Sequence, residues 1–229
     1  NPDVVYAIIH RNLIVSKDAG EHWAYVLTGS VTGIAVNENE PGILTVLQID
    51  GRVLRSADCG DSFTDVTGDL PQGNLLRCIM VSASEIWVST TDGGNGRIYQ
   101  TADGGKHWTL VNLDYPSPAD PHSLYADPDD PDTVYVSFKN AQNEMLRGTN
   151  AAKYLQKTTD GGQTWTWLSI PHGDAMVYVL GKSANGALFV SAGGTVLRSA
   201  DDGGSWTKID SQYARNGDII DIAFGPDDP

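Results

Sequence analysis

Cysteine is scarce in this chain, with two residues, Cys59 and Cys78, among 229. Two cysteines cannot form the disulfide framework of a small secreted domain, so a buried core must hold the fold. Long apolar runs are also missing, which argues against a membrane-spanning helix. No signal peptide is visible, and the chain begins with Asn1 rather than Met. We therefore expect that the N-terminus was processed or trimmed from something longer.

Basic residues are the second shortage. Fifteen Lys and Arg stand against 29 Asp and Glu, which gives a formal net charge of −14 and a pI of about 4.5. Such a surface repels phosphate backbones and anionic lipids, so the sequence predicts no nucleic-acid partner and no membrane insertion. Catalytic and cofactor motifs are missing too, including Gly-x-Ser-x-Gly and His-Glu-x-x-His. The acidic stretch 127–132 lacks the central Gly and terminal Glu of a calcium loop, so we expect neither a cofactor nor a metal.

What the chain does contain is one eight-residue pattern written five times. The pattern is Ser/Thr-x-Asp-x-Gly-x-x-Trp/Phe, and its copies span residues 16–23, 56–63, 101–108, 158–165 and 199–206. Its aspartates are separated by 40, 45, 57 and 41 residues, counting from Asp18 through Asp58, Asp103 and Asp160 to Asp201. Repeats of this length are typical of the four-stranded blades of a β-propeller.

Each repeat is expected to hold four short strands, which we call A to D. Strand B is rich in β-branched and aromatic residues, as in 133–138, and strand C follows a glycine turn, as in 194–199. The repeated pattern makes the turn from C to D, and strand D starts at its aromatic residue. We find no amphipathic helix, so the sequence predicts an all-β, antiparallel propeller with five blades in one domain, residues 1–229.

The two ends of the chain complement each other. Residues 219–224 read as a strand A, whereas residues 4–7 read as a strand B. In one interpretation the C-terminal strand 219–224 completes the first blade and covers its exposed edge. In the other, the chain is a window of a propeller with six to ten blades. The sequence leaves both interpretations open.

The repeated turn has a structural explanation. A short Asp or Ser side chain can accept backbone N–H bonds within its own turn, and Gly supplies a positive φ. The Trp or Phe then packs between neighbouring strands. Since five copies on successive blades cannot all line one small site, we predict that the turn is structural rather than catalytic.

These five repeats resemble Asp-box (BNR) repeats, and the link Pro-Asp-Asp-Pro-x-x-Val-Tyr at 128–135 is similar to that of bacterial Asp-box propellers. The resemblance covers essentially the whole chain. Family members include sialidases, xyloglucan-active glucanases, sortilin-type receptors and a photosystem II assembly factor, so the resemblance implies the fold but no single function. It also implies that the boxes lie on the face away from an active site. The Arg-Ile-Pro motif of sialidases is absent here.

The search for chemistry therefore moves to the face opposite the boxes. Aligning the expected A strands on Gly33, Cys78, Ser123, Val177 and Asp221 places aspartates three residues upstream in three repeats, namely Asp120, Asp174 and Asp218. Paired carboxylates cleave glycosidic bonds, one as acid and one as nucleophile or base, so these three are the predicted catalytic residues. Aspartate also commonly ends a turn before a strand, and that interpretation stays open. The same loops supply the predicted binding residues Arg77, His122, Arg147, His172, Tyr213 and Arg215.

The fourth repeat carries a long insertion, residues 139–153, between strands B and C. Long polar loops often carry function, so this one is the candidate surface for a protein partner. Two hypotheses follow. The first is an extracellular or periplasmic, carbohydrate-directed propeller related to glycoside hydrolases, which binds or cleaves an oligo- or polysaccharide. The second is a non-catalytic protein-interaction or assembly scaffold. The sequence does not decide whether the protein is an enzyme.

Overall fold

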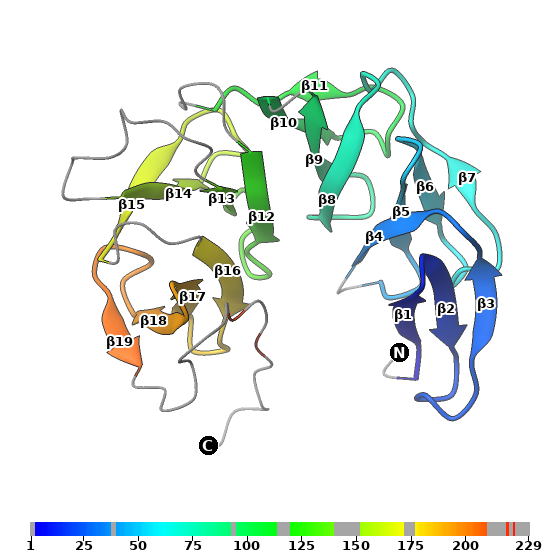
Figure 1. The fold of residues 1–229 in the computed structure, drawn as a ribbon, viewed down its shortest axis with the longest axis horizontal. Helices are drawn as coiled ribbons and strands as arrows, with labels where there is room; N and C mark the ends of the chain where they lie inside the picture. The colour runs from blue at the N-terminus through cyan, green and yellow to red at the C-terminus, as the bar shows by residue number, and fades with distance from the viewer. Residues whose placement is uncertain are drawn as a thin grey trace. The chain divides into compact units, whose positions relative to one another are not determined.

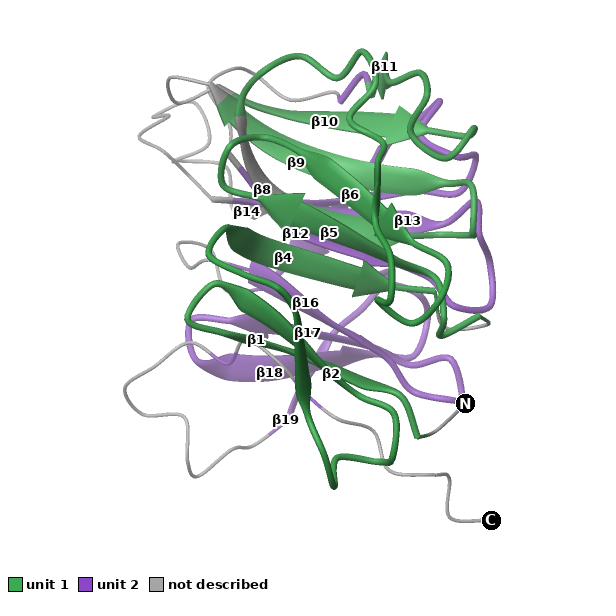
Figure 2. Cartoon of the chain, turned by 90° about the vertical axis from the view of Figure 1, so that its right-hand side faces the viewer, with its two compact units in different colours: residues 1–111 green, residues 112–229 purple. Residues whose placement is uncertain are grey.

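The computed structural model describes residues 3–37, 40–92, 95–113, 120–139, 152–171, 177–209, 219 and 222. These residues form strands and turns only, so they contain no helix with the length and apolarity that a membrane span requires. The chain divides into two compact units, residues 1–111 and residues 112–229 (Figure 2).

Unit 1 holds three antiparallel sheets (Figure 1). The first has three strands, β1 (Val5–Ile9), β2 (Asn12–Ser16) and β3 (Ala24–Leu27). The second consists of β4 (Val31–Val36), β5 (Leu44–Gln48), β6 (Val53–Ser56) and β7 (Thr64–Asp65). The third consists of β8 (Asn74–Met80), β9 (Ile86–Asp92), β10 (Asn95–Thr101) and β11 (Thr109–Leu110).

Unit 2 holds two four-stranded sheets. One consists of β12 (Asp120–Ala126), β13 (Val134–Lys139), β14 (Ala152–Thr158) and β15 (Thr166–Ile170). The other consists of β16 (Val177–Lys182), β17 (Leu188–Ala192), β18 (Thr195–Ser199) and β19 (Thr207–Ile209). In all four-stranded sheets sequential strands are neighbours, which confirms the predicted A-B-C-D plan. The first sheet begins at strand B, as its sequence indicates.

The core lies between the faces of successive sheets. Leu13 of β2, Val31 of β4 and Leu44 of β5 are at most 1% exposed and form one apolar cluster. Leu47, Val53 and Val88 belong to the cluster between the second and third sheets. The inner strands β5, β6, β17 and β18 are buried nearly throughout, whereas the outer strands β3, β7, β11 and β19 are largely exposed.

The Asp-box forms the turn from strand C to strand D in all five sheets, as predicted. The first Ser or Thr of the box accepts the N–H of the box Gly at 2.7–3.0 Å and donates its hydroxyl to the Asp at 2.7–2.8 Å. The Gly has a φ between +85° and +97°. The residue before it is also left-handed, even where it is not Gly, at Ala19, Cys59 and Asp202.

One regular feature of the box was missed in the sequence. The residue just before the aromatic donates its side chain to the second oxygen of the Asp at 2.6–2.7 Å in every copy, through His22, Ser62, His107, Thr164 and Ser205. The pattern is therefore Ser/Thr-x-Asp-x-Gly-x-(Ser/Thr/His)-Trp/Phe. The signal was visible, because this position never holds a residue that cannot donate.

The aromatic residue behaves as expected only in part. Trp108 is 8% exposed, and its indole N–H donates to the carbonyl of Val66 in the preceding sheet at 3.3 Å. Trp23, by contrast, is 43% exposed and donates to Gly20 of its own box. The expectation that every box aromatic is buried is wrong for Trp23, because no sheet precedes the first one within unit 1.

β-Bulges shift the register of the A strands. Gly33 pairs with Leu47, Arg77 with Ser89, Ser123 with Ser137 and Tyr178 with Ser191, each at the same level of strand B. The sequence alignment placed Cys78 and Val177 at this level, so it was wrong by one residue in β8 and β16. The bulge of β16, between Val179 and Gly181, lies on the other side of this level from the bulges of β4, β8 and β12, which accounts for the shift in β16. The bulge of β8 has the same place as those of β4 and β12 and does not account for the error there.

Candidate functional site

Most of the predicted site lies outside the described residues. This is true of Asp174, Asp218, Arg147, His172, Tyr213, Arg215 and nearly all of the 139–153 insertion. The backbone of Asp120 pairs with Lys139 at the start of β12, and His122 falls at the bulge between Pro121 and Ser123. Arg77 lies on β8 opposite Ser89, and its side chain is exposed.

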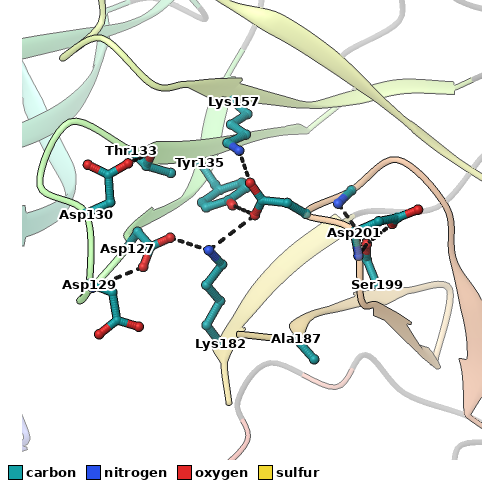
Figure 3. A network of polar contacts seen from close by, with 12 residues as sticks. Asp127, Asp129, Asp130, Thr133, Tyr135, Lys157, Lys182, Ala187, Ser199 and Asp201 are labelled. Atoms are coloured by element: carbon teal, nitrogen blue, oxygen red, sulfur yellow. Dashed lines mark hydrogen bonds and ion pairs between the residues drawn. The ribbon is translucent and has the colours of Figure 1, made fainter. Parts of the chain in front are cut away.

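The acidic stretch 127–132 is part of a polar network rather than a metal loop (Figure 3). Asp130 accepts the hydroxyl of Thr133 at 2.7 Å, and Asp127 accepts the N–H of Asp129 at 3.1 Å. Asp127 is also ion-paired with Lys182 of β16. The carboxylates of Asp127 and Asp130 are therefore occupied by their own turn and, for Asp127, by a lysine from the next sheet.

Lys182 joins two carboxylates, since it also lies 3.2 Å from Asp202. Asp202 in turn pairs with Lys157 and accepts the hydroxyl of Tyr135. Burial favours the neutral form of Asp202, but the hydrogen bonds from Lys157, Tyr135 and Lys182 outweigh it and lower its pKa to about 2. Burial would likewise lower the pKa of Lys182, whereas its bonds to both carboxylates raise it.

This network is buried at Asp127 and Lys182, open to solvent at Asp202, whose side chain is 41% exposed, and balanced in charge. The side chain of Asp127 is 2% exposed and that of Lys182 is 13% exposed. Two lysines face two aspartates across the two sheets of unit 2, so each buried charge has a partner. We conclude that the network holds these sheets together and does not offer a free group for chemistry.

The box end of unit 1 offers a possible cation site, but its geometry has a simpler explanation. Asp18, Glu21 and His22 place ligand atoms within 4.8 Å of one another. Asp18 and His22 are hydrogen-bonded to each other at 2.6 Å, as Asp103 and His107 are at 2.7 Å in the third box. The Asp–His contact therefore belongs to the box turn.

The largest groove that we describe in unit 1 also lies at the box end, between the second and third sheets. It has a volume of about 640 Å³. Its carboxylates are bonded locally, Asp65 to Thr67 at 2.6 Å and Asp103 to His107. Arg55 donates to the carbonyl of Ala83 at 3.0 Å. The polar groups of this groove thus serve the fold.

Charge is divided unevenly between the two ends of unit 1. The box end consists of the C–D and A–B turns and carries the acidic residues Asp18, Glu21, Glu40, Asp58, Asp61, Glu85 and Asp103. Its exposed basic residues are Lys17 and Lys106, and Lys17 is paired with Asp61 at 2.6 Å. The box end is therefore strongly acidic.

The opposite end carries exposed arginines. Arg11 lies in the β1–β2 turn, Arg52 in the β5–β6 turn, and Arg97 pairs with Thr90 close to the β9–β10 turn. Arg77 flanks the same part of β9. We call Arg11, Arg52, Arg77 and Arg97 the arginine end.

Backbone contacts place the β1–β2 and β5–β6 turns on either side of the start of β4, while Arg77 and Arg97 lie on opposite faces of the third sheet, opposite Ser89 and Thr90. The carbonyl of Arg11 accepts the N–H of Val31 at 3.0 Å, and Ser30 accepts the N–H of Ile49 at 2.8 Å. Arg52 is paired with Asp50 at 2.9 Å. Within the described residues no carboxylate pairs with the other three arginines. Asp50 and Asp92 belong to the same turns, so the four arginines exceed these two carboxylates by two charges. In a molecule of net charge −14 this end is therefore the one that suits an anionic ligand.

Comparison with known proteins identifies the family. Residues 51–173, which are 123 of the 229, match the model of the Sortilin-Vps10 family, described as sortilin and neurotensin receptor 3. The chain belongs to this family of Asp-box propellers, as its repeats predicted.

Two curated relatives differ in function. The chain is 28% identical over 146 residues to the photosystem II assembly lipoprotein Ycf48 of Synechococcus sp. (strain CC9902), covering 62% of this chain and 38% of that protein. It is 24% identical over 191 residues to a xyloglucanase of Paenibacillus sp., covering 70% of this chain and 18% of that enzyme. The chain thus spans well under half the length of either relative.

Solved structures confirm the fold class. The structure of YCF48 bound to D1 peptide matches with a TM-score of 0.65 at 15% identity, covering 94% of this chain and 66% of that one. The GH74 enzyme of Niastella koreensis matches with a TM-score of 0.63 at 20% identity, covering 86% of this chain and 34% of that one. The chain is an all-β propeller of antiparallel blades.

Proposed function

We propose that this propeller is a protein-binding module that holds an acidic, extended segment of a partner at the arginine end. The observation that carries the proposal is the separation of charge in unit 1. Exposed guanidinium groups recognise carboxylates through paired hydrogen bonds. Electrostatic attraction between the arginines and an acidic segment also raises the rate of association. The likeness to a YCF48 structure that holds a D1 peptide supports a peptide ligand.

The alternative chemistry has less support among the described residues. Seven aspartates there have a shifted pKa, and all seven shifts are downward: Asp18, Asp50, Asp58, Asp103, Asp160, Asp201 and Asp202. A glycosidic acid needs the opposite shift, because it must stay protonated until it donates, so these seven carboxylates are unsuited to that role. The alternative chemistry rests on Asp120, Asp174 and Asp218, none of which is among them. We further propose an extracytoplasmic location, in keeping with the lipoprotein among the relatives.

Binding of a fluorescein-labelled octaglutamate peptide, followed by fluorescence anisotropy, tests the proposal. We expect saturable binding in 50 mM NaCl that weakens strongly by 300 mM NaCl, because salt screens exposed charges. An octaglutamine peptide is the neutral control and should not bind. If octaglutamate fails to bind in low salt, as simple repulsion by the net charge of −14 would require, the proposal is wrong.

Carbohydrate cleavage remains a second candidate, favoured by the similarity to a xyloglucanase over 70% of this chain. In this case Asp120, Asp174 and Asp218 supply the acid and the nucleophile or base. Hydrolysis of a glycan panel, xyloglucan included, should then be lost in Asp174→Asn or Asp218→Asn while the melting temperature stays unchanged. Absence of hydrolysis by the unaltered protein would reject this function.

The 139–153 insertion is a second proposed contact for a protein partner. Deleting residues 140–150 should then reduce capture of that partner. Octaglutamate binding should remain, since the arginine end belongs to unit 1. Equal capture with and without the insertion would exclude this contact.

A further inference from the structure

The turn between β1 and β2 is unusual in its backbone. His10 and Arg11 connect the strands after the pair Ile9–Asn12, with φ values of +48° and +64°. A two-residue hairpin turn with both φ positive strongly favours Asn-Gly or Gly-Gly, because a Cβ is strained in that region. Neither His nor Arg is a usual choice here.

The chain itself shows the usual choice. In the fifth sheet, Gly193 and Gly194 connect β17 and β18 after the pair Ala192–Thr195, with φ values of +55° and +73°. The same two-residue turn is therefore built from glycines where only the backbone matters. Two strained residues at the equivalent place in the first sheet need another reason.

Packing does not supply that reason. The turn is held by its backbone and by Asn12, since Arg11 accepts the N–H of Val31 at 3.0 Å and the Asn12 side chain accepts the N–H of Gly29 at 2.8 Å. Both side chains of the turn are exposed. The fold would keep every one of these contacts with Asn-Gly in their place. Strain that the fold does not use is a mark of a functional position.

We propose that His10 and Arg11 form the specificity-determining contact of the arginine end, where they take a carboxylate of the acidic segment. This inference rests on the function proposed above and names its central residues. The guanidinium of Arg11 can hold a carboxylate through two N–H donors, and the adjacent imidazole of His10 adds a further donor. The tight turn fixes both side chains next to each other, which lowers the entropy that binding must overcome.

The double variant His10→Asn/Arg11→Gly tests the proposal by moving stability and binding in opposite directions. Relief of strain should raise the melting temperature by roughly 2–4 °C. The same change should weaken octaglutamate binding at least tenfold. The single variant Arg11→Gln, which keeps the turn strained, should lose most of the binding with no rise in melting temperature. Lys106→Gln at the box end removes the same charge and should leave the affinity unchanged.

The outcomes separate this inference from the function on which it rests. If the unaltered protein does not bind octaglutamate, the proposed function fails. If it binds and the double variant binds equally well, the function stands and the other arginines carry it, so the inference about the turn is wrong. A double variant that melts at a lower temperature would also overturn it, because the turn would then be stabilising rather than strained.

Discussion

Both oxygens of each box aspartate are hydrogen-bonded within the turn of that box. In Asp58, for example, the bonds from the Ser62 hydroxyl, the Ser62 N–H and the Ser56 hydroxyl lower its pKa to about 2. The same arrangement lowers the pKa of Asp18, Asp160 and Asp201 to about 2. The turns are therefore built around ionised carboxylates.

A dependence on acid follows from these shifts. Because the folded-state pKa lies below the unfolded value of about 3.9, the stabilisation is complete above that value. It is lost as pH falls through about 2. We expect the melting temperature to be steady from pH 7 to 5 and to drop between about pH 4 and 2, measured by circular dichroism. A melting temperature that does not change down to pH 2 would contradict this account of the box.

The ion network of unit 2 predicts a large difference between two lysines. Lys182→Ala leaves Asp127 buried without its partner and should lower the free energy of unfolding by about 3–5 kcal/mol. Lys17→Ala breaks the exposed Lys17–Asp61 pair and should change stability little. Urea unfolding measures both. Similar losses for the two variants would show that burial of the network does not matter.

The sequence predicted the hydrogen bonds of the Asp-box turn but not the ion network of unit 2. The positions of Ser, Asp and Gly in one turn are local, so the sequence predicts their bonds. Asp127 and Lys182 meet only because the fourth and fifth sheets pack together, and 55 residues separate them in the chain. The stretch 127–132 lacks the pattern of a calcium loop, but its lysine partner could not be predicted, because Lys182 comes from a strand of another sheet.

The second and third sheets approach closely where the third box meets the segment that follows β7. A Cβ on Gly105 would lie 2.4 Å from the carbonyl oxygen of Val66, whereas a Cβ on Gly104 would meet nothing within 4 Å. Both residues have positive φ values. Substitution of Gly104 therefore measures the strain within the turn, and substitution of Gly105 adds the steric contact between the sheets.

We expect Gly105→Ala to lower the free energy of unfolding by about 3 kcal/mol or more, because backbone must move to admit the methyl group. Gly104→Ala should cost only about 1–2 kcal/mol, since Ala19 and Cys59 adopt the same conformation in other boxes. Urea unfolding of the two variants decides the matter. Equal costs would mean that the close approach to Val66 is unimportant.

Strand existence was predictable, whereas strand register was not. Turn residues and apolar runs located the four strands of each repeat. The bulge at Val179/Gly181 moved the expected level in β16 by one residue, to Tyr178. In β8 the level lies at Arg77, although its bulge matches those of β4 and β12. Asp174 was chosen by counting from an A strand. In the fifth repeat that count started one residue away from the level that the other repeats use. A bulge depends on the neighbouring strand, which single-strand patterns do not record.

At the scale of the whole molecule, the overall composition did not indicate that unit 1 has an arginine end. The net charge of −14 suggested general repulsion of anions. Once the strand order is known, each turn can be assigned to one end of unit 1 from the sequence alone. This assignment places the acidic residues of the boxes at one end and the four arginines at the other. The box located the acidic end in the sequence, but only Arg77 of the arginine end was among the predicted binding residues.

The first sheet predicts a role for the C-terminal residues. Among the described residues β1 pairs with β2 along one edge only, and Ile8 and Ile9 are 39% and 41% exposed. We propose that strand 219–224 covers the other edge. Removing residues 219–229 should then speed hydrogen exchange of the β1 amides and promote aggregation, measured by mass spectrometry and light scattering. Unchanged exchange would mean that another strand covers β1.

The measurement that tests the proposed binding surface most directly compares two double charge reversals. Arg11→Glu/Arg97→Glu at the arginine end and Lys17→Glu/Lys106→Glu at the box end change the net charge equally. We predict that the first abolishes octaglutamate binding in fluorescence anisotropy, while the second leaves the dissociation constant within about twofold of the unaltered protein. Equal loss in both variants would show that net charge, and not the arginine end, governs binding.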